Sequence, residues 1–174
     1  MKYFIVNGKP CSGKDTFVNF CLEELSAFGK LISTVDFVKK IATECGWDGT
    51  KDLKNRKFLS DLKDLLTNWG DVPYTKTLQE IKLFYYDLEY YDVENSGVVF
   101  IMSREPEEIS RFEKELGAKS ILIRRNAVEF NEQSNHADSE VLNHKYHYII
   151  DNNDTLEELK IKAQEFCNYI KKEL

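Results

Sequence analysis

Apolar residues fall into short continuous runs that alternate with longer stretches of helical periodicity. Residues 2–7 form a β-branched and aromatic run with little alternation, which is typical of a strand covered on both faces. From Lys14 onward the apolar positions recur at helical spacing, and Gly29 favours the end of that helix. The start of the chain therefore predicts a strand, a loop and a helix.

The same two patterns continue along the chain. Apolar runs predict further strands at residues 31–35, 98–102, 120–124 and 146–151. Helical spacing predicts further helices at residues 36–45, 55–69, 75–93, 106–116 and 155–174. Asp36 stands where it would cap the second helix. Strands that alternate with helices imply an α/β fold with a five-stranded parallel sheet, and we expect one domain over residues 1–174.

Two stretches leave alternatives open. The helix predicted at 75–93 is unusually aromatic, and its rings form either core and helix-packing surface or the wall of a nucleobase pocket. These rings are Phe84, Tyr85, Tyr86, Tyr90 and Tyr91. Residues 126–143 are polar with no clear period, so they are either a lid that closes over a ligand or a disordered segment. Within them, His136, Asp138 and Glu140 are either a metal site or ordinary loop residues.

Composition narrows the class of protein. The chain is 42% hydrophobic and 31% charged, as in ordinary globular proteins. Its net charge of −6 argues against nucleic acid as a partner, although small phosphorylated ligands need only a local cluster of cations. The sequence lacks a run of eighteen apolar residues, so we expect no membrane span and no membrane partner. The four cysteines form no CxxC pair, which indicates a reducing cytoplasm.

The chemistry-bearing motif is Gly8-Lys9-Pro10-Cys11-Ser12-Gly13-Lys14, which matches GxxxxGK between a predicted strand and a predicted helix. Glycines let the backbone turn successive N–H groups toward phosphate oxygens, and the helix N-terminus adds partial positive charge. The Lys14 ammonium can follow the β- and γ-phosphates into the transition state. The motif therefore predicts a nucleotide-phosphate site.

The residue after Lys14 departs from the usual motif. Asp15 replaces the Ser or Thr that touches Mg²⁺, and Thr16 follows it. Asp15 either holds the metal through a water or is only a first-turn residue that the helix dipole favours. Thr16 can donate its hydroxyl to an inner phosphate.

The form Ser12-Gly13-Lys14-Asp15-Thr16 resembles the nucleoside monophosphate kinase branch of P-loop proteins. SGKDT is most similar to phage-type deoxynucleoside monophosphate kinases, and SGKD also resembles animal-type phosphomevalonate kinases. Shorter likenesses to that group lie at Asp36–Lys39 (Asp-x-x-Lys), Arg56, Arg104–Glu108 (Arg-x-Pro-x-Glu), His136–Glu140 and Asn152–Leu159.

This resemblance implies a three-layer α/β/α P-loop NTPase fold and a phosphotransferase that uses ATP and Mg²⁺. Its acceptor would be a small phosphorylated molecule, first of all a (deoxy)nucleoside monophosphate. The alternatives are a non-nucleotide phosphate such as phosphomevalonate, or a nucleotide-binding regulatory protein without turnover. Residues 126–143 would be the lid, and the helices within 36–93 would bind the acceptor. We expect a monomer or a homodimer.

The residues that would carry these roles fall into four groups. The ATP contacts are Gly8, Cys11, Ser12, Gly13, Lys14, Asp15, Thr16 and Asn152, and the Mg²⁺ contact is Asp15. The acceptor contacts are Asp36, Lys39, Arg56 and Arg104. The catalytic cations are Lys14, Arg104, Arg124 and Arg125.

Several of these residues also have simpler explanations. Arg104 follows a buried strand at the sheet edge where ligands gather, which favours a contact with the acceptor phosphate; the alternative is a surface ion pair with Glu107 or Glu108. Asp36 either accepts a hydrogen bond from the acceptor or only caps its helix.

One position departs from the family pattern. The related kinases have an Asp two residues before the Arg at the end of the third strand, where it helps to order Mg²⁺, and this chain has Met102. We hypothesise that Asp15 compensates. The substitution also motivates the alternative of a protein that binds nucleotide without turnover.

Overall fold

The computed structural model describes residues 1–50, 52–91, 97–129 and 141–172. His136, Asp138, Glu140 and most of the predicted lid therefore lie outside the described residues. The strands are β1 (Lys2–Asn7), β2 (Gly29–Ser33), β3 (Val98–Met102), β4 (Lys119–Arg124) and β5 (Tyr148–Asp151). The α-helices are α1 (Lys14–Leu25), α2 (Asp36–Glu44), α3 (Leu53–Gly70), α4 (Val72–Tyr90), α5 (Pro106–Leu116), α6 (Asn126–Glu129) and α8 (Leu156–Lys172). Short 3₁₀ turns lie at Ser26–Phe28 and Val141–Asn143.

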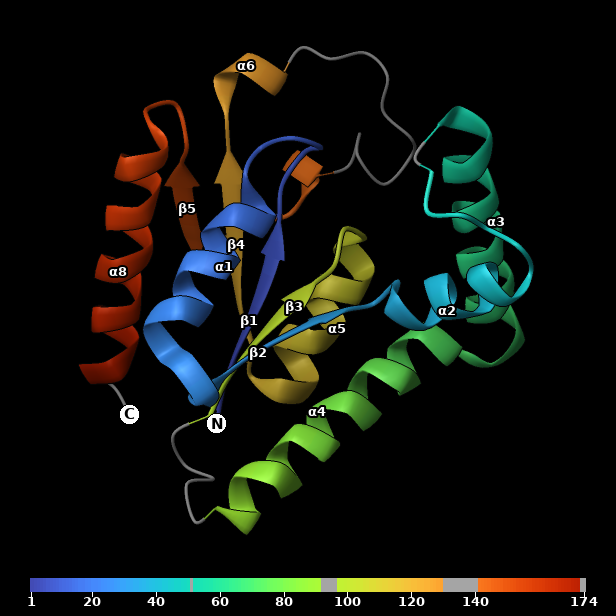
Figure 1. Ribbon diagram of the computed structural model, residues 1–174, viewed down its shortest axis with the longest axis horizontal. Helices are drawn as coiled ribbons and strands as arrows, with labels where there is room; N and C mark the ends of the chain where they lie inside the picture. Colours follow the sequence, from blue (N-terminus) through green and yellow to red (C-terminus); the bar gives the residue numbers. More distant parts are fainter. Residues whose placement is uncertain (51, 92–96, 130–140, 173–174) are drawn as a thin grey trace.

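The five strands form one sheet in the order β2-β3-β1-β4-β5 (Figure 1). Each neighbouring pair is parallel, and the register aligns Val6 of β1 with Met102 of β3, and Met102 with Ser33 of β2. Parallel strands need crossover connections, which the helices between them provide. The predicted α/β fold with a five-stranded parallel sheet is confirmed, and β1 lies at its centre.

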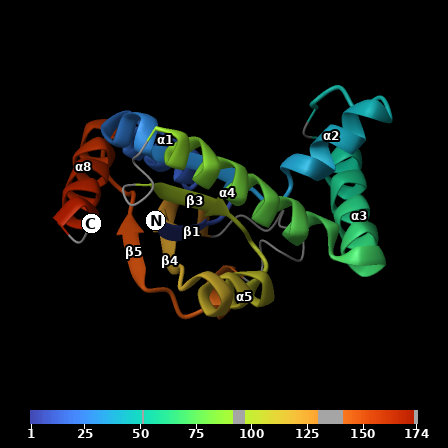
Figure 2. The same cartoon turned by 90° about the horizontal axis from the view of Figure 1, so that it is seen from below.

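Helices cover both faces of the sheet and make a three-layer molecule (Figure 2). α1 and α8 pack on one face against Phe4, Val6 and Phe100. α4 and α5 pack on the other face against Ile5 and Ile101. Successive side chains of a strand point to opposite faces, so a strand covered twice needs apolar residues at every position. This explains the continuous apolar run in β1.

The aromatic helix α4 divides its rings between the core and the surface. Phe84 is buried with the α5 face of the sheet, as the packing interpretation predicts. Tyr85, Tyr86, Tyr90 and Tyr91 are exposed instead. The helix therefore contributes one ring of this group to the core and leaves a band of tyrosines on the surface.

α2 and α3 form an arm that stands away from the sheet (Figures 1 and 2). The sequence pattern predicts an apolar face on α3, but the helix has no buried residue, and Leu65 is 64% exposed. The reason is that α3 packs on α2 and α4 rather than on the sheet. Two thin helices cover less of an apolar face than a sheet does.

The capping role expected for Asp36 is wrong. Val35 occupies the N-cap of α2, and no side chain caps that helix end. The Asp36 carboxylate instead accepts a hydrogen bond from the backbone N–H of Ser33 at 2.8 Å. β2 is an edge strand, and Thr34 donates its N–H inward to the Met102 carbonyl at 3.1 Å. Asp36 therefore satisfies a donor on the open edge of the sheet.

Candidate functional site

The glycine loop joins the central strand β1 to helix α1 and is shaped by two glycines. Gly13 precedes α1 with φ 93°, a conformation that side chains with a Cβ avoid. A Cβ on Gly13 would lie 2.3 Å from the Asn152 Nδ2 atom, and one on Gly8 would lie 2.5 Å from the Ile123 carbonyl oxygen. Both positions therefore require glycine because neighbouring atoms fill the space.

The donors of the loop converge where α1 begins. The first N–H groups of any helix have no carbonyl partner within it, and here they belong to Lys14 and the residues after it. The Ser12 hydroxyl is buried and has no hydrogen-bond partner among the described residues. The Lys14 Nζ atom lies 3.4 Å from the Lys9 carbonyl, so its ammonium stays over the loop. A buried hydroxyl without a partner, a helix N-terminus and an ammonium fit the oxygens of a phosphate chain.

Asn7, which the sequence interpretation missed, holds three segments together beneath this loop. Its Oδ1 accepts from the Gly8 N–H at 2.7 Å, and its Nδ2 donates to the Arg104 carbonyl at 3.2 Å and to the Tyr146 hydroxyl at 2.8 Å. The Tyr146 hydroxyl in turn donates to the Val141 carbonyl at 2.7 Å. Asn7 is fully buried. A polar residue ending a buried strand beside the motif is the sequence signal that could have identified it.

Asn152 contacts the loop from the other side. Its Nδ2 donates to the Ser12 carbonyl at 2.9 Å, and its backbone N–H donates to the Arg124 carbonyl at 2.8 Å. The structure thus brings Asn152 to the predicted ATP site, where its amide holds the loop backbone.

Arg104 lies just past the end of β3, in a loop tied to its neighbours on both sides. Its carbonyl accepts from Asn7, and the preceding Ser103 donates its hydroxyl to the Glu108 carboxylate. Glu108, one of the ion-pair partners considered for Arg104, also lies 3.5 Å from the Lys63 Nζ atom of α3. Lys63 was not among the predicted residues, because a lysine on an amphipathic helix is usually a solvated cation.

Arg124 and Arg125 lie beside the phosphate loop at the end of β4. Together with Lys9 and Ser12 they line a small hollow of about 10 Å³. The Arg124 guanidinium makes two hydrogen bonds to the Asp151 carboxylate, at 2.6 and 3.0 Å. These hydrogen bonds are the main reason that the pKa of Asp151 is lowered from its ordinary value. The Arg124–Asp151 pair links the ends of β4 and β5.

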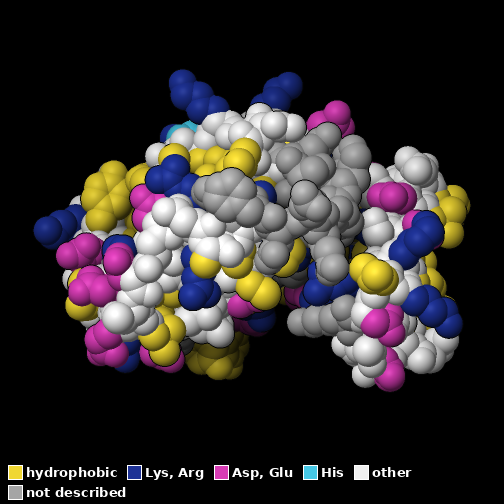
Figure 3. Space-filling model, turned by 90° about the horizontal axis from the view of Figure 1, so that it is seen from above, with side chains coloured by type: hydrophobic (Ala, Val, Ile, Leu, Met, Phe, Trp, Pro, Cys, Tyr) yellow, Lys and Arg dark blue, Asp and Glu magenta, His cyan; other side chains and the backbone are white. Residues whose placement is uncertain are grey.

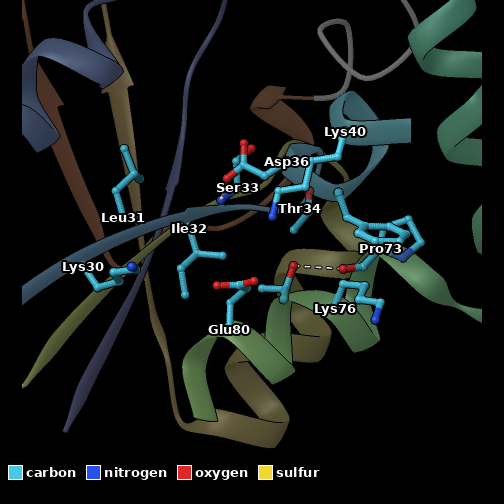
Figure 4. A pocket seen from close by; sticks show the side chains of 12 residues that line it. Lys30, Leu31, Ile32, Ser33, Thr34, Asp36, Lys40, Pro73, Lys76 and Glu80 are labelled. Carbon is cyan, nitrogen blue, oxygen red and sulfur yellow. Dashed lines mark hydrogen bonds between the residues drawn. The ribbon is translucent and has the colours of Figure 1, made fainter. Parts of the chain in front are cut away.

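A larger cavity of about 360 Å³ lies between the edge of β2, α2 and α4 (Figure 4). Asp36 lines it, whereas Lys39 does not, although its Nζ atom lies 3.5 Å from the Asp36 carboxylate. No residue of the glycine loop and no tyrosine of α4 lines this cavity. The nucleobase-pocket interpretation of the α4 rings therefore gains no support from it. The charged side chains of its lining are Lys30, Asp36, Lys40, Lys76 and Glu80.

The remaining acceptor and metal candidates lie apart. Arg56 is exposed on α3. Lys and Arg side chains are visible on the arm at the right of Figure 3. Asp15 is exposed on the first turn of α1. Met102 ends β3 and packs against the α1 face of the core. Among the described residues, no three His, Cys, Asp or Glu side chains gather as a metal site. Magnesium in nucleotide sites takes one or two carboxylates plus phosphate oxygens, so Asp15 fits as such a ligand.

The fold and the loop together define a class: this is an α/β/α protein of the P-loop NTPase fold, with its glycine loop after the central strand. No protein-family model matches the chain, and no curated protein matches it. Within the part of the chain that the structure describes, no helix is long and apolar enough to cross a membrane.

Solved structures that resemble this chain include proteins described as kinases. The APS kinase of Mycobacterium tuberculosis is 12% identical with a TM-score of 0.47, covering 98% of this chain and 96% of that one. The shikimate kinase of Bacteroides thetaiotaomicron is 11% identical with a TM-score of 0.46, covering 96% and 98%. A Chloroflexus aurantiacus protein assigned provisionally as a kinase is 13% identical with a TM-score of 0.49, covering 99% and 98%. Likenesses this distant assign neither a family nor an activity.

Proposed function

We propose that this protein transfers the γ-phosphoryl group of ATP to a small phosphorylated acceptor. The observation that carries the proposal is the loop itself, in which the buried Ser12 hydroxyl without a partner, the N-terminus of α1 and the Lys14 ammonium converge. A phosphate chain would satisfy all three. The sequence resemblance to nucleoside monophosphate kinases supports a transferase rather than a hydrolase.

In this proposal different cations bind the phosphates of the donor and the phosphate of the acceptor. Lys14 holds the β- and γ-phosphates, and Arg104, at the adjacent strand end, holds the acceptor phosphate. The bond from the γ-phosphorus to the ADP oxygen breaks as a bond to an acceptor phosphate oxygen forms. The acceptor is already an anion, so no general base is needed. Arg124 and Arg125 lie close enough to the loop to stabilise charge that develops there.

Magnesium would neutralise the phosphate oxygens when bound, and the chain offers Asp15 to hold it. Asp15 precedes Thr16 on the first turn of α1, next to the phosphate site. The strand-end carboxylate of the related kinases is replaced by Met102, which is partly buried and packs against the core. Asp15 is thus the carboxylate that the loop itself contributes.

The first choice of acceptor is a nucleoside monophosphate, on the resemblance of the loop and of Asp36–Lys39. A non-nucleotide phosphate is the second candidate. It is favoured by the cavity beside Asp36, whose charged lining includes three lysines. Three lysines suit an anionic acceptor, and the aromatic ring in the lining is that of Phe37.

A coupled assay of ADP formation over nucleoside monophosphates, deoxynucleoside monophosphates and phosphomevalonate tests the proposal. We expect turnover with one acceptor class, and a loss of roughly 100-fold or more in Lys14→Met. Lys172→Met, at the exposed end of α8, should leave the rate unchanged. Asp15→Asn should raise the Mg²⁺ concentration needed for half-maximal rate. Tight ATP binding with no ADP formed from any acceptor would overturn the transferase and support the regulatory alternative.

A further inference from the structure

The arm formed by α2 and α3 contacts α5 through an enclosed ion pair, although α3 itself is largely exposed. α3 buries no residue fully, yet the Lys63 side chain is only 12% exposed. Its Nζ atom lies 3.5 Å from the Glu108 carboxylate of α5, which is 13% exposed, and 3.9 Å from Glu105. Long cationic side chains normally remain in water, so a lysine this enclosed is held by its partners.

Glu108 connects Lys63 to the loop of residues 103–105, which carries Arg104 and is called the acceptor loop below. The same carboxylate oxygen that faces Lys63 accepts a hydrogen bond from the hydroxyl of Ser103, which is 2% exposed. Ser103 directly precedes Arg104, and the carbonyl of Arg104 is held by Asn7 from beneath the glycine loop. A continuous line of contacts therefore runs from α3 through Glu108 to the loop that carries Arg104.

We infer that Lys63 and Glu108 are positioning residues, which fix Arg104 relative to α3 so that the acceptor phosphate meets the phosphate loop. The inference rests on the proposed function, in which Arg104 holds that phosphate. An enclosed ion pair that contributes little net stability still fixes geometry, because either charge left alone is costly. In this inference Lys63 acts through Glu108 and Ser103 rather than by binding the acceptor itself.

If the ion pair is only structural, its loss should change the KM values for ATP and for the acceptor alike. If it positions Arg104, its loss should change only the KM for the acceptor. We expect Lys63→Met, which keeps the length of the apolar stem, to raise KM for the acceptor by roughly tenfold or more, since small misplacements of a binding group have effects of this size. The KM for ATP should change by less than about twofold, because no residue of the glycine loop takes part in the Lys63–Glu108 contact and Asn152 holds that loop from the other side. Lys63→Arg should retain most of the wild-type KM for the acceptor.

The same helix provides a matched control. Lys57 forms an ion pair with Asp61 at 2.8 Å, but these side chains are 75% and 59% exposed. Lys57→Met removes an identical charge from α3 without touching the acceptor loop, so both KM values should stay unchanged. Glu108→Gln should raise the acceptor KM as Lys63→Met does, and the double variant should be no worse than the worse single variant. Equal changes for ATP and acceptor, an effect in Lys57→Met, or additive effects would overturn the inference.

Amide hydrogen exchange tests the series of contacts from Lys63 to Arg104, here called the relay, without an activity assay. Lys63→Met should speed exchange in α3 and in residues 103–105 while leaving α1 unchanged, and Lys57→Met should leave residues 103–105 unchanged. If the wild-type protein transfers phosphate to no acceptor, the proposed function fails, and the exchange result alone decides whether Lys63 fixes the loop. Unchanged exchange at residues 103–105 would overturn the relay whatever the activity.

Discussion

At the scale of single residues, the glycine loop depends on a close approach between Gly13 and Asn152. The missing Cβ of Gly13 leaves room for the Asn152 amide, which donates to the Ser12 carbonyl at 2.9 Å. This arrangement joins a left-handed backbone with a buried hydrogen bond. Any side chain at position 13 would disturb both.

Gly13→Ala is therefore expected to destabilise the protein more than the strain of an alanine in a left-handed conformation alone would do. Gly49 is the matched control, because its φ of 90° is nearly the same and nothing lies within 4 Å of its added Cβ. We expect Gly13→Ala to lower the free energy of unfolding by roughly 1–3 kcal/mol more than Gly49→Ala, since it also displaces a buried hydrogen bond. Urea unfolding of both variants measures this difference. Equal losses would show that the Asn152 contact contributes nothing.

The residues of the loop itself were predictable, because their order and spacing follow from how backbone N–H groups bind phosphate. The residues that support the loop were not. Asn7 and Tyr146 meet through contacts 139 positions apart, and Lys63 meets Glu108 across 45 positions. No local periodicity records such pairs. The function of a buried amide or an enclosed lysine becomes visible only when the strands are assembled.

At the scale of elements, the edge strand β2 is finished by a side chain rather than by another strand. An open edge exposes unpaired donors and acceptors, and the Asp36 carboxylate satisfies the donor of Ser33. Asp36 also lines the cavity along the same edge. Asp36 therefore makes a structural contact with Ser33, and a second contact with the acceptor is proposed.

Two substitutions at Asp36 separate these roles. Asp36→Asn keeps an oxygen that can accept the Ser33 N–H, so the free energy of unfolding should change by less than about 0.5 kcal/mol, within the range of a surface substitution. Asp36→Ala removes that oxygen and should cost up to about 1 kcal/mol. If Asp36 also contacts the acceptor, both variants should lower kcat/KM for the acceptor. Full activity in Asp36→Asn would restrict Asp36 to the strand edge.

The types and order of the elements followed well from the hydrophobic pattern. β1, β3 and α5 have the predicted bounds, because a doubly covered strand and a Pro-to-Gly helix leave clear signals. For α3 the pattern predicted the helix and its apolar face, but not that this face would lack a buried residue. Periodicity reports that a helix has an apolar side, but the area that covers this side depends on its neighbours.

At the scale of the whole molecule, one partly buried hydroxyl joins segments that lie far apart in the sequence. Tyr146 contacts Asn7 of β1 and Val141, while Asn7 also holds Arg104. Burial is the main reason that the pKa of Tyr146 is raised to about 12, outweighing the hydrogen bond from Asn7, which lowers it. The folded protein therefore keeps this proton where the unfolded chain releases it.

Stability at high pH should reveal this proton. The ordinary pKa of a tyrosine is 10.0, so the contribution of Tyr146 is fully present below pH 10 and is lost as the pH rises through about 12. At neutral pH, Tyr146→Phe should lower the free energy of unfolding by roughly 1–2 kcal/mol, because Asn7 and Val141 lose a partner. This difference from wild type should shrink above pH 10. Tyr90→Phe, on a ring that is 84% exposed, is the control and should track the wild type at every pH.

The hydrogen bond from Asn152 to the Ser12 carbonyl also has a consequence for the order of folding. It spans 140 positions, and β5 and α8, which flank Asn152 in the sequence, are synthesised long after the glycine loop. A growing chain therefore displays the complete GxxxxGK sequence early, but it lacks the amide that holds the loop until residue 152 has left the ribosome. Closing such long-range contacts is the slow part of folding a parallel sheet. The motif is synthesised early, whereas the hydrogen bond that holds its loop can form only after Asn152 has been made.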